Sequence, residues 1–451
     1  MFKELLNKIL KREIALDPTN PEHMQLLEKL KGSLNLFGNI YNKMYEYYKG
    51  NTDAIEGYLF IEKRSNLKIH ANYIKKFIKE EVSYTVGNDI TYESRSNNNQ
   101  FIKDIDYYTA HWDEKHDSEL MKYLLIFTTI YELYYIDENG DFCTRIIKPT
   151  EGYVYIDNKT QRIFAFIHKI KDDLTNEVTY DIYTDDYIYT FDSQLKLKNV
   201  DKNIFGKVPV TVGKLSEEGA DDSLYKDIKG LQDAFETNLS DIGNEISDFR
   251  NAYLLFMNCR IDEDKVEDMK KLGIIQLPGE KAAAKWLIKD INDTFIQNTL
   301  DRYEDTMYQL ACHINHNEKL QSNLSGVALE SRLIALRNKC TLEIKAHKNM
   351  VKNRIMFLCI YLSKKRKNYD YKDIKPIYTP NVPRDDAATA DIISKLPEGM
   401  ISKDTLRGRF SFINNKVVED EKVKKEQKEE LENENFNFKD NHNINNPEGD
   451  E

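Results

Sequence analysis

The chain has 451 residues, enough for about two to four domains, and 40% of its residues are hydrophobic while 31% are charged. This balance indicates a folded globular protein and excludes a mainly disordered chain. The formal net charge of −11 excludes a generally basic nucleic-acid-binding protein, because such binding needs lysine and arginine to displace the counterions of the phosphates.

The N-terminal part of the chain is predicted to be helical. It begins MFKELLNKILKREIALD, which is amphipathic and charged throughout and therefore does not predict a signal peptide. Residues 20–82 carry apolar side chains at helical spacing, and the stretch NYIKKFIKEEVSYTVG ends at Gly87, where a helix is expected to stop. The polar run SRSNNNQ at 94–100 then predicts a loop.

The most apolar stretch of the chain is YLLIFTTIYELYYI at 123–136. A helix that spans a bilayer needs about 20 predominantly apolar residues. This stretch is shorter and is interrupted by Glu132, so we expect no membrane segment.

Between about 142 and 212 the apolar pattern changes to a period of two. Aromatic and β-branched runs are separated by short turns rich in Asp, Asn and Lys; the runs are YVYID (153–157), RIFAFIHKIK (162–171), VTYDIYT (178–184) and YIYTF (187–191). Because parallel strands need long crossover connections, the short turns predict an antiparallel β meander.

The meander is followed by GKVPVTVGK at 206–214, which contains a Gly-Lys pair and a second glycine. A phosphate-binding loop needs four residues between its glycines and a Ser or Thr after the lysine, and neither condition is met. No such motif occurs elsewhere in the chain, so the protein is not expected to be an ATP-driven motor itself.

The clearest helical pattern lies between 228 and 256. One apolar stripe follows about 29 residues, or roughly 43 Å of helix; its members are Ile228, Leu231, Phe235, Leu239, Ile242, Ile246, Phe249, Tyr253 and Phe256. The acidic residues off this stripe are Asp233, Glu236, Asp241, Glu245 and Asp248. They form either a solvated acidic face or a face turned towards a negatively charged neighbour that must not adhere.

The next segments are predicted as an insert followed by two helices. Residues 259–292 form a compact insert with a short helix and strands punctuated by Gly and Pro, and a second amphipathic helix follows at about 293–313. The chain then has no Gly or Pro from 327 to 375. A helix from there to about Arg366 would have about 40 residues and a length of roughly 60 Å.

The C-terminal part is predicted to hold short helices after Pro380 and a disordered end. The stretch from 426, EQKEELENENFNFKDNHNINNPEGDE, is charged, rich in Asn and poor in apolar residues. Such a segment cannot bury enough apolar surface to offset the entropy of ordering it.

Two histidine clusters have some similarity to metal sites. In HWDEKH (111–116) the two histidines are five residues apart and lie on different helical faces, unlike the H-E-x-x-H arrangement of zinc hydrolases. Cys312, His313 and His316 adjoin a polar loop but have no fourth ligand nearby in sequence, and the alternative is a helix end with solvated histidines. The five cysteines are widely spaced without a C-x-x-C, so neither a zinc ribbon nor a disulfide framework is indicated, and a reducing cytosol fits.

No catalytic signature is present. The chain has no G-x-S-x-G motif, no nucleophilic cysteine signature and no dinucleotide-binding fingerprint. We therefore predict that the protein is not an enzyme and has no cofactor and no metal site.

Six blocks of the sequence together resemble a known family. They are YNKMYEYYKGN (41–51), KIHANYIKKFIKEEVSYTVGNDITY (68–92), DENGDFCTRIIKPTEGYVYID (137–157), GKVPV (206–210), SLYKDIKGLQDAFETNLSDIGNEISDFRNAYLLF (223–256) and NLSGVALESRLIAL (323–336). In this order they resemble the portal proteins, or head-to-tail connectors, of tailed double-stranded-DNA phages, specifically the siphovirus portal family. The resemblance covers about residues 40–366, and it departs at Gly87-Asn88-Asp89, where the family often has Gly-x-Pro.

The resemblance implies an α+β, mainly helical portal fold that assembles as a cyclic ring. It implies a wing with an antiparallel β meander, a two-helix stem, a small α/β clip, a long wing-crossing helix and a crown. The implied boundaries are 1–222 for the wing, 223–257 and 293–313 for the stem helices, 258–292 for the clip, 314–325 for a tunnel loop, 326–379 for the long helix and return to the wing, 380–425 for the crown and 426–451 for a disordered acidic tail.

The resemblance also implies a function and a set of partners. Such proteins form a ring, usually of about twelve subunits and sometimes of thirteen when isolated, at one capsid vertex of the virion. Double-stranded DNA passes through the central channel during packaging and ejection. Implied protein partners are the terminase large subunit, a head–tail adaptor, and the major capsid and scaffolding proteins, with assembly in the host cytoplasm and no membrane partner.

Carried onto this sequence, the resemblance predicts two sets of channel residues. The first is a tunnel loop facing the DNA, with His316, Asn317, Glu318, Lys319, Gln321, Ser322 and Asn323, followed by Gly326 as a hinge. Lys319 is the only Lys or Arg in 314–325 and would form a basic band around a ring. The second is the acidic face of the first stem helix, which would repel DNA and so prevent it from adhering.

Two alternative functions remain at the level of sequence. One is a metal-dependent hydrolase that uses HWDEKH or the Cys312/His316 region. The other is a phage structural or scaffold-binding protein that shares the helical pattern but forms no ring.

Overall fold

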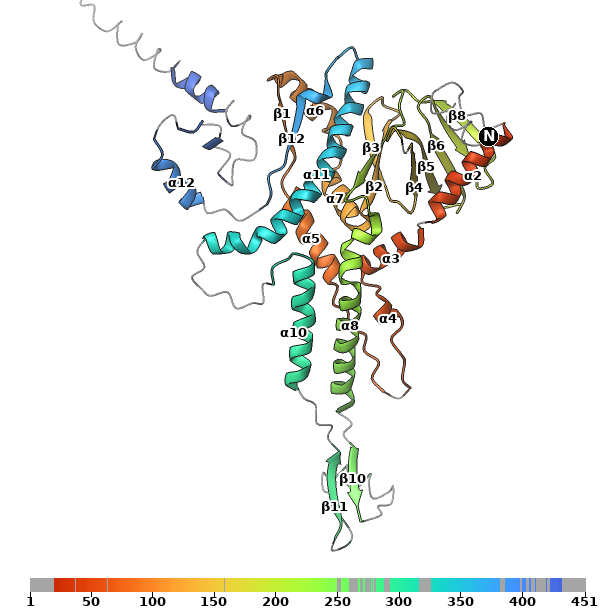
Figure 1. Cartoon of the computed structure of the whole chain (residues 1–451), viewed down its shortest axis with the longest axis vertical. Helices are drawn as coiled ribbons and strands as arrows, with labels where there is room; N and C mark the ends of the chain where they lie inside the picture. Colours follow the sequence, from red (N-terminus) through yellow and green to blue (C-terminus); the bar gives the residue numbers. More distant parts are fainter. Residues whose placement is uncertain are drawn as a thin grey trace, which may run out of the picture.

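The computed structural model has a long helical pair that points away from a mixed body of helices and sheets (Figure 1). The structure describes residues 20–249 apart from 37, 63 and 158, and then 253–258, 267, 271, 277, 279, 281–287, 293–315 and 326–381. Nearer the C-terminus it describes 386–397, 400–402, 405–406, 410, 419 and 422–431. The predicted tunnel loop from 316, most of the predicted clip and the tail from 432 lie outside the described residues.

The N-terminal helices confirm the helical prediction for 20–82 in part, and the prediction is wrong for residues 57–72, which lie between two helices. They are α2 (Pro21–Leu36), α3 (Gly38–Lys49), α4 (Asp53–Glu56) and α5 (Tyr73–Val86). The polar run 94–100 is a loop only in part, because Asn98 caps the next helix, α6 (Asn99–Thr109), by accepting a hydrogen bond from the Phe101 amide. Asparagine is favoured at this position since its side chain satisfies an amide that has no partner within the helix.

The apolar stretch 123–136 is divided between a helix and a strand. The helix α7 (His116–Phe127) ends at Thr128, whose φ of 59° is left-handed, and the strand β2 (Thr129–Ile136) follows at once. In a three-stranded antiparallel sheet, β2 lies between β3 (Phe142–Ile147) and β9 (Val210–Lys214). The sequence pattern did not assign this central strand, because helix and strand are both apolar here and the period does not separate them.

The predicted antiparallel meander is confirmed as a five-stranded sheet. Its order follows the chain: β4 (Gly152–Ile156), β5 (Ile163–Lys171), β6 (Val178–Tyr183), β7 (Tyr187–Phe191) and β8 (Leu197–Lys202). One face is covered by α2, whose Leu27 and Leu30 share a buried cluster with Ile167 and Phe191. The strand β8 was not predicted; it is exposed along its whole length and so lacks an apolar alternation.

The helical pair consists of α8 (Leu224–Phe249), preceded by the short 3-10 turn η1 (Gly219–Asp222), and α10 (Asp293–Leu310). We call these two helices the stem. The prediction that α8 continues to about 257 is wrong, because Tyr253 and Phe256 lie in the strand β10 (Tyr253–Met257), which pairs with β11 (Ala283–Leu287). A short, wholly apolar run is compatible with either a helix or a strand. This run pairs with β11 at the far end of the stem and is therefore a strand (Figure 1).

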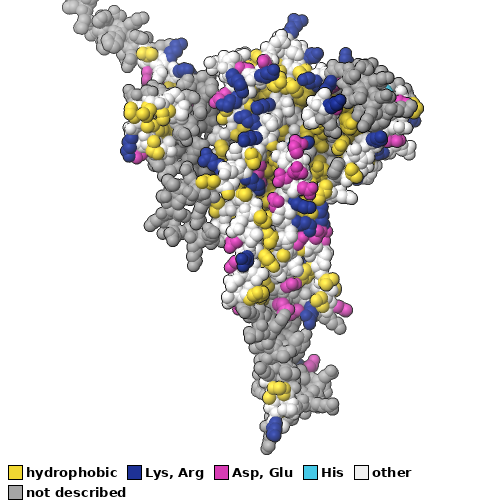
Figure 2. Space-filling view, viewed as in Figure 1, with side chains coloured by type: hydrophobic (Ala, Val, Ile, Leu, Met, Phe, Trp, Pro, Cys, Tyr) yellow, Lys and Arg dark blue, Asp and Glu magenta, His cyan; other side chains and the backbone are white. Residues whose placement is uncertain are grey.

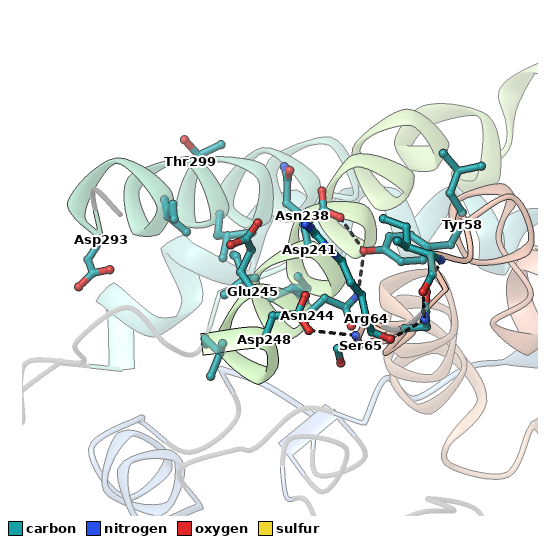
Figure 3. A pocket seen from close by; sticks show the side chains of 18 of the residues that line it. Tyr58, Arg64, Ser65, Asn238, Asp241, Asn244, Glu245, Asp248, Asp293 and Thr299 are labelled. Atoms are coloured by element: carbon teal, nitrogen blue, oxygen red, sulfur yellow. Dashed lines mark hydrogen bonds between the residues drawn. The ribbon is translucent and has the colours of Figure 1, made fainter. Parts of the chain in front are cut away.

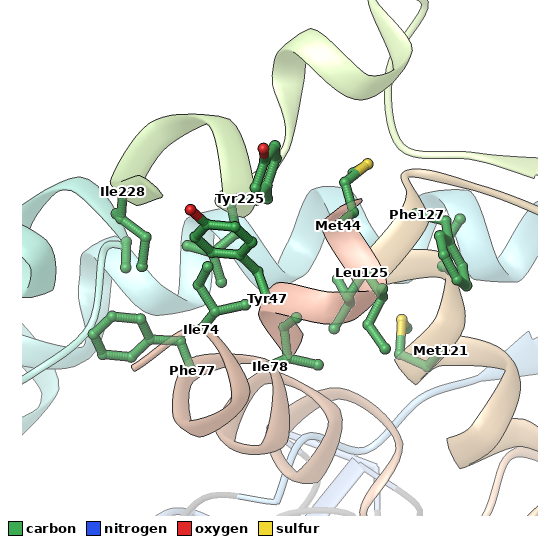
Figure 4. Packing of buried hydrophobic residues seen from close by; sticks show 14 of the residues in the cluster. Met44, Tyr47, Ile74, Phe77, Ile78, Met121, Leu125, Phe127, Tyr225 and Ile228 are labelled. Carbon is green, nitrogen blue, oxygen red and sulfur yellow. The ribbon is translucent and has the colours of Figure 1, made fainter. Parts of the chain in front are cut away.

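The longest helix, α11 (Gly326–Lys364), has 39 residues and confirms the prediction from the Gly- and Pro-free stretch. It is followed by η2 (Tyr371–Asp373) and by β12 (Ile374–Ile377), which pairs with β1 (Thr91–Ser94). A buried cluster joins α11 to the stem and to α3, α5 and α7 (Figure 4); it includes Tyr47, Phe77, Leu125, Ile228, Met307 and Met350. The stem therefore shares a single core with the body that supports it.

The C-terminal region corrects one boundary. The helix α12 (Asp386–Ser394) fits the prediction of short helices after Pro380. Residues 422–431 are also helical, and the Lys425–Glu429 ion pair within them has helical spacing. The prediction of disorder from 426 is therefore wrong for residues 426–431. Within the described ranges, no helix is long and apolar enough to cross a membrane.

Candidate functional site

The surface of α8 binds the extended segment 65–73 through a regular series of hydrogen bonds, which we call the side-chain ladder. The amides of Tyr73, Ala71, Ile69, Leu67 and Ser65 donate, in that order, to the side chains of Gln232, Glu236, Ser240, Asn244 and Asp248. The donor–acceptor distances lie between 2.6 Å for Leu67 and 3.2 Å for Tyr73. Every second residue of the segment therefore meets every fourth residue of the helix.

The ladder is possible because the two repeats nearly match in length. Four residues of an α-helix rise about 6.0 Å, and two residues of an extended chain rise about 6.6 Å. Two side chains also donate back, Asn244 to the carbonyl of Leu67 and Gln232 to that of Ala71. The helix thus supplies the partners that a neighbouring strand would supply in a sheet.

The ladder is buried and well satisfied at its centre. Gln232, Glu236 and Ser240 are almost fully buried. The Glu236 carboxylate accepts hydrogen bonds from the Ala71 amide, the Thr52 hydroxyl and the Gln232 side chain. Three donors stabilise a buried carboxylate without a metal or a cationic partner. At Gly243, a Cβ atom would lie 2.8 Å from Ile69 Cδ1, so a glycine lets the segment approach the helix.

The prediction of one solvated acidic face on α8 is wrong for Glu236, which is buried in the ladder. Asp233 is half-buried and accepts hydrogen bonds from the Tyr47 hydroxyl at 2.8 Å and from Lys229 at 2.7 Å. Asp241 is exposed but accepts a 2.6 Å hydrogen bond from Tyr58, while Asp248 binds the Ser65 amide (Figure 3). Glu245 lines a hollow beside the stem. Most of these carboxylates accept hydrogen bonds from their own chain. The spacing of apolar residues in the sequence carries no information about such bonds.

The hollow beside the stem has a volume of about 720 Å³ and lies between the segment 58–66, α8 and α10 (Figure 3). Its lining includes apolar side chains that are largely exposed in the single chain: Leu59 at 81%, Ile61 at 52% and Ile246 at 61%. Singly exposed apolar residues are common, but a group of them around a concave surface is typical of a contact with another molecule.

The second feature of the site is a buried ionic cluster where the stem ends. His313, just after α10, lies between two carboxylates of α5, with Nδ1 at 2.7 Å from Glu80 and Nε2 at 2.9 Å from Glu81. Lys339 of α11 binds Glu81 at 2.5 Å and the carbonyl of Ala311 at 3.1 Å. The interpretation of His313 as a solvated helix-end histidine is therefore wrong, since its ring is fully buried.

This cluster joins the residue that precedes the predicted tunnel loop, and the helix that follows the loop, to α5. His313 precedes the loop, and Lys339 lies on the helix that follows it. The loop residues His316, Asn317, Glu318, Lys319, Gln321, Ser322 and Asn323 lie outside the described residues, and Gly326 is the first residue of α11. The hinge role of Gly326 stays a prediction.

The charges in the cluster are coupled. Burial favours the neutral form of Glu81, but Lys339 and His313 hold its pKa below the usual value. Burial, together with the nearby charge of Glu81, raises the pKa of Glu343 to about 8. One carboxyl oxygen of Glu343 is buried without a hydrogen-bond partner among the described residues. Glu343 is therefore held in the protonated form near neutral pH.

A second buried cluster explains the HWDEKH motif. Arg354 of α11 donates to Asp117 at 2.7 Å and to Glu132 at 2.9 Å, and His116 Nε2 lies 2.8 Å from the same Glu132 oxygen. Although burial opposes ionisation, Arg354 lowers the pKa of both carboxyl groups to about 2.

The other histidine of the motif, His111, contacts Cys143 at 3.6 Å and does not join this cluster. In the part of the chain that the structure describes, no group of three His, Cys, Asp or Glu residues is placed to hold a metal ion. The motif thus contributes His116, which contacts the same Glu132 carboxylate that Arg354 of α11 binds.

The comparison with protein-family models agrees with the sequence resemblance. Residues 35–434 match the family described as "Phage portal protein, SPP1 Gp6-like". No curated protein matches the chain. A chain in the structure "Neck of empty GTA particle computed with C6 symmetry" is similar, with 10% identity, a TM-score of 0.48 and coverage of 74% of this chain and 89% of that chain. A chain in "Virion of native gene transfer agent (GTA) particle" has 10% identity, a TM-score of 0.44 and coverage of 74% and 87%.

The ladder generates a prediction for Asn244. Replacing Asn244 with Ala leaves the amide and carbonyl of Leu67 without their partner, so we expect the free energy of unfolding to fall by about 1–3 kcal/mol. Urea unfolding of the purified protein measures this change. Asn238→Ala on the same helix is the matched control and should stay within about 0.5 kcal/mol of the wild type. Equal stability of the two variants would contradict the ladder.

The ionic cluster generates a prediction on pH. Because the folded pKa of Glu343 is about 8 and its ordinary value is 4.5, its contribution to stability is fully present below pH 4.5 and is lost as the pH rises towards 8. Glu343→Gln lacks this titration, so the variant should gain thermal stability relative to the wild type across that window. Thermal unfolding at a series of pH values checks this, and parallel curves for the two proteins would refute it.

Proposed function

The chain belongs to the SPP1 Gp6-like phage portal protein family, and from this premise we propose that it forms a closed ring of about twelve subunits around a DNA channel. The ring would occupy one vertex of a phage capsid and act in DNA packaging and ejection. The single observation that carries the proposal is the family match over residues 35–434, which includes the stem and the whole of α11. The family is structural, and we assign the chain no catalytic role.

The partners follow from the proposed position of the ring. The β10–β11 hairpin at the far end of the stem is a projecting docking point for the terminase large subunit and later for a head–tail adaptor (Figure 1). The major capsid and scaffolding proteins would contact the body. The ring would assemble in the host cytoplasm and remain in the virion.

The charge of the stem supports a channel through which DNA moves without adhering. Together α8 and α10 contain ten acidic and three basic residues. Glu236 is buried in the ladder and so cannot contribute to a surface that repels DNA. The repelling groups would be the accessible acidic residues of the stem, and Asp241 is the most exposed of the five predicted residues. A net negative stem repels phosphate and prevents the counterion release that would hold DNA in place.

The hollow beside the stem supports a ring contact. A closed ring needs two different surfaces that meet head to tail, and the hollow is concave and partly apolar. A neighbouring copy seated over Leu59, Ile61 and Ile246 would cover apolar area that the single chain leaves exposed.

The experiment for the proposed function is the mass of the protein in solution. Copies of the 53.0 kDa chain in a ring of about twelve should give a particle of about 0.6 MDa. We expect Ile246→Asp to reduce the fraction of rings, because a charge would be buried in the contact, whereas Leu174→Asp, at a side chain 93% exposed on the wing sheet, should not. A wild type that is monomeric in all salt conditions would contradict the ring and favour a non-ring structural protein.

The predicted tunnel loop is proposed to touch the DNA through Lys319. In a ring, Lys319→Glu would replace a positive charge with a negative one in every subunit. The variant should therefore lower the amount of DNA packaged per particle. Quantifying encapsidated DNA in particles assembled with the variant measures the effect, and Lys196→Glu, the same charge reversal at an exposed residue before β8, is the control. Unchanged packaging with Lys319→Glu would contradict a DNA contact of the loop.

A further inference from the structure

The helix α11 has the opposite charge to the rest of the molecule. It contains eight basic and two acidic residues, in a chain whose net charge is −11. Figure 2 shows Lys and Arg side chains gathered over α11 and the neighbouring β1–β12 pair. We call Lys345, Lys348, Lys352 and the adjoining Lys375 of β12 the lysine face.

The geometry of the lysine face is a short straight row. Lys345, Lys348 and Lys352 follow one another at spacings of three and four residues, so they share one side of α11 and extend over about 10 Å. Lys345 and Lys352 are exposed and Lys348 is half-buried. The nearest acidic residue on the described part of the helix is Glu343, which is buried on another side.

The positive charge of this face is compensated only in part by the described residues around it. Lys375 pairs with Glu93 at 3.3 Å, while no ion pair joins Lys345, Lys348 or Lys352 to an acidic group in the described ranges. Partial burial and repulsion from Lys375 and Lys352 lower the pKa of Lys348, against the smaller opposing effect of Glu93. A group of like charges held close together costs stability and is typical of a surface that binds an anion.

The acidic groups of a second copy fit this face less well than nucleic acid does. In the stem, Asp233, Asp241 and Asp248 already accept hydrogen bonds within their own chain. Of the acidic residues just before α8, Glu217 pairs with Lys214 and Asp221 with Lys226, while Glu218 and Asp222 are exposed. A phosphate backbone, by contrast, presents regularly spaced charges to a row of lysines and needs no specific partner side chain.

We propose that the lysine face of α11 is a contact surface for the phosphate backbone of double-stranded DNA. Recognition is independent of sequence, weak and dependent on salt, as expected for a surface with lysines and no base-reading groups. The proposed function supplies the reason for DNA to be near the protein, and this inference rests on it. The contact lies on α11 and the adjoining β12, outside the acidic stem.

The test compares two triple variants with the same loss of charge. One replaces Lys345, Lys348 and Lys352 with Gln, and the control replaces the exposed Lys196, Lys198 and Lys202 around β8 with Gln. Binding of a fluorescent duplex of about 30 base pairs is measured by anisotropy between about 50 and 200 mM salt. We expect the α11 variant to bind at least about tenfold more weakly, with a salt slope smaller by about 2–3, and the control to bind like the wild type.

Three outcomes would overturn the proposal. Equal losses in both variants, or no loss in either, would mean that the lysine face has no special part in binding. Loss of the assembled particle in the α11 variant alone would assign the face to a subunit contact. A wild type that forms no ring bears on the proposed function and leaves the comparison of DNA affinities unaffected.

Discussion

The side-chain ladder between α8 and the segment 65–73 is the interaction on which the position of the stem depends. The segment has no strand partner there, yet its amides are satisfied because polar residues recur at every fourth position of the helix. A buried amide without a partner costs about 1–3 kcal/mol, and these five amides are partly buried and so depend on these acceptors. The ladder therefore fixes the register of α8 against the body, and with it the direction in which the stem and its terminal hairpin project.

Two buried ionic clusters extend this control to α11. Lys339 attaches the helix to α5 and to the end of α10, and Arg354 attaches it to α7 and β2. The two anchors are separated by fifteen residues, or about 22 Å of helix. Breaking a buried pair is costly because it leaves an uncompensated charge, so the two pairs hold α11 firmly against the body.

The sequence predicted those parts of the fold that depend on apolar periodicity. The stripe through Ile228 and Phe235 gave α8, and the alternating aromatic runs gave the meander. The strand at Tyr253 was missed because a wholly apolar run has no period, and the ladder was missed because its members are polar and share only their spacing. His313 and Glu236 were assigned to solvent for a similar reason: burial of a polar residue depends on partners distant in sequence. The series Gln232, Glu236, Ser240, Asn244 and Asp248 was the signal that could have been used.

Charge is unevenly distributed over the molecule, because the stem is acidic and α11 is basic. In the proposed ring, a phosphate backbone would be repelled along the stem and attracted weakly along α11. The separation of the acidic stem from α11 requires the ladder to hold the stem in a fixed position. Hydrogen exchange of the amides of Leu67, Ile69 and Ala71 tests the ladder most directly. The account predicts exchange slowed by at least about a hundredfold relative to an unstructured chain. Exchange of these amides at unprotected rates would contradict it.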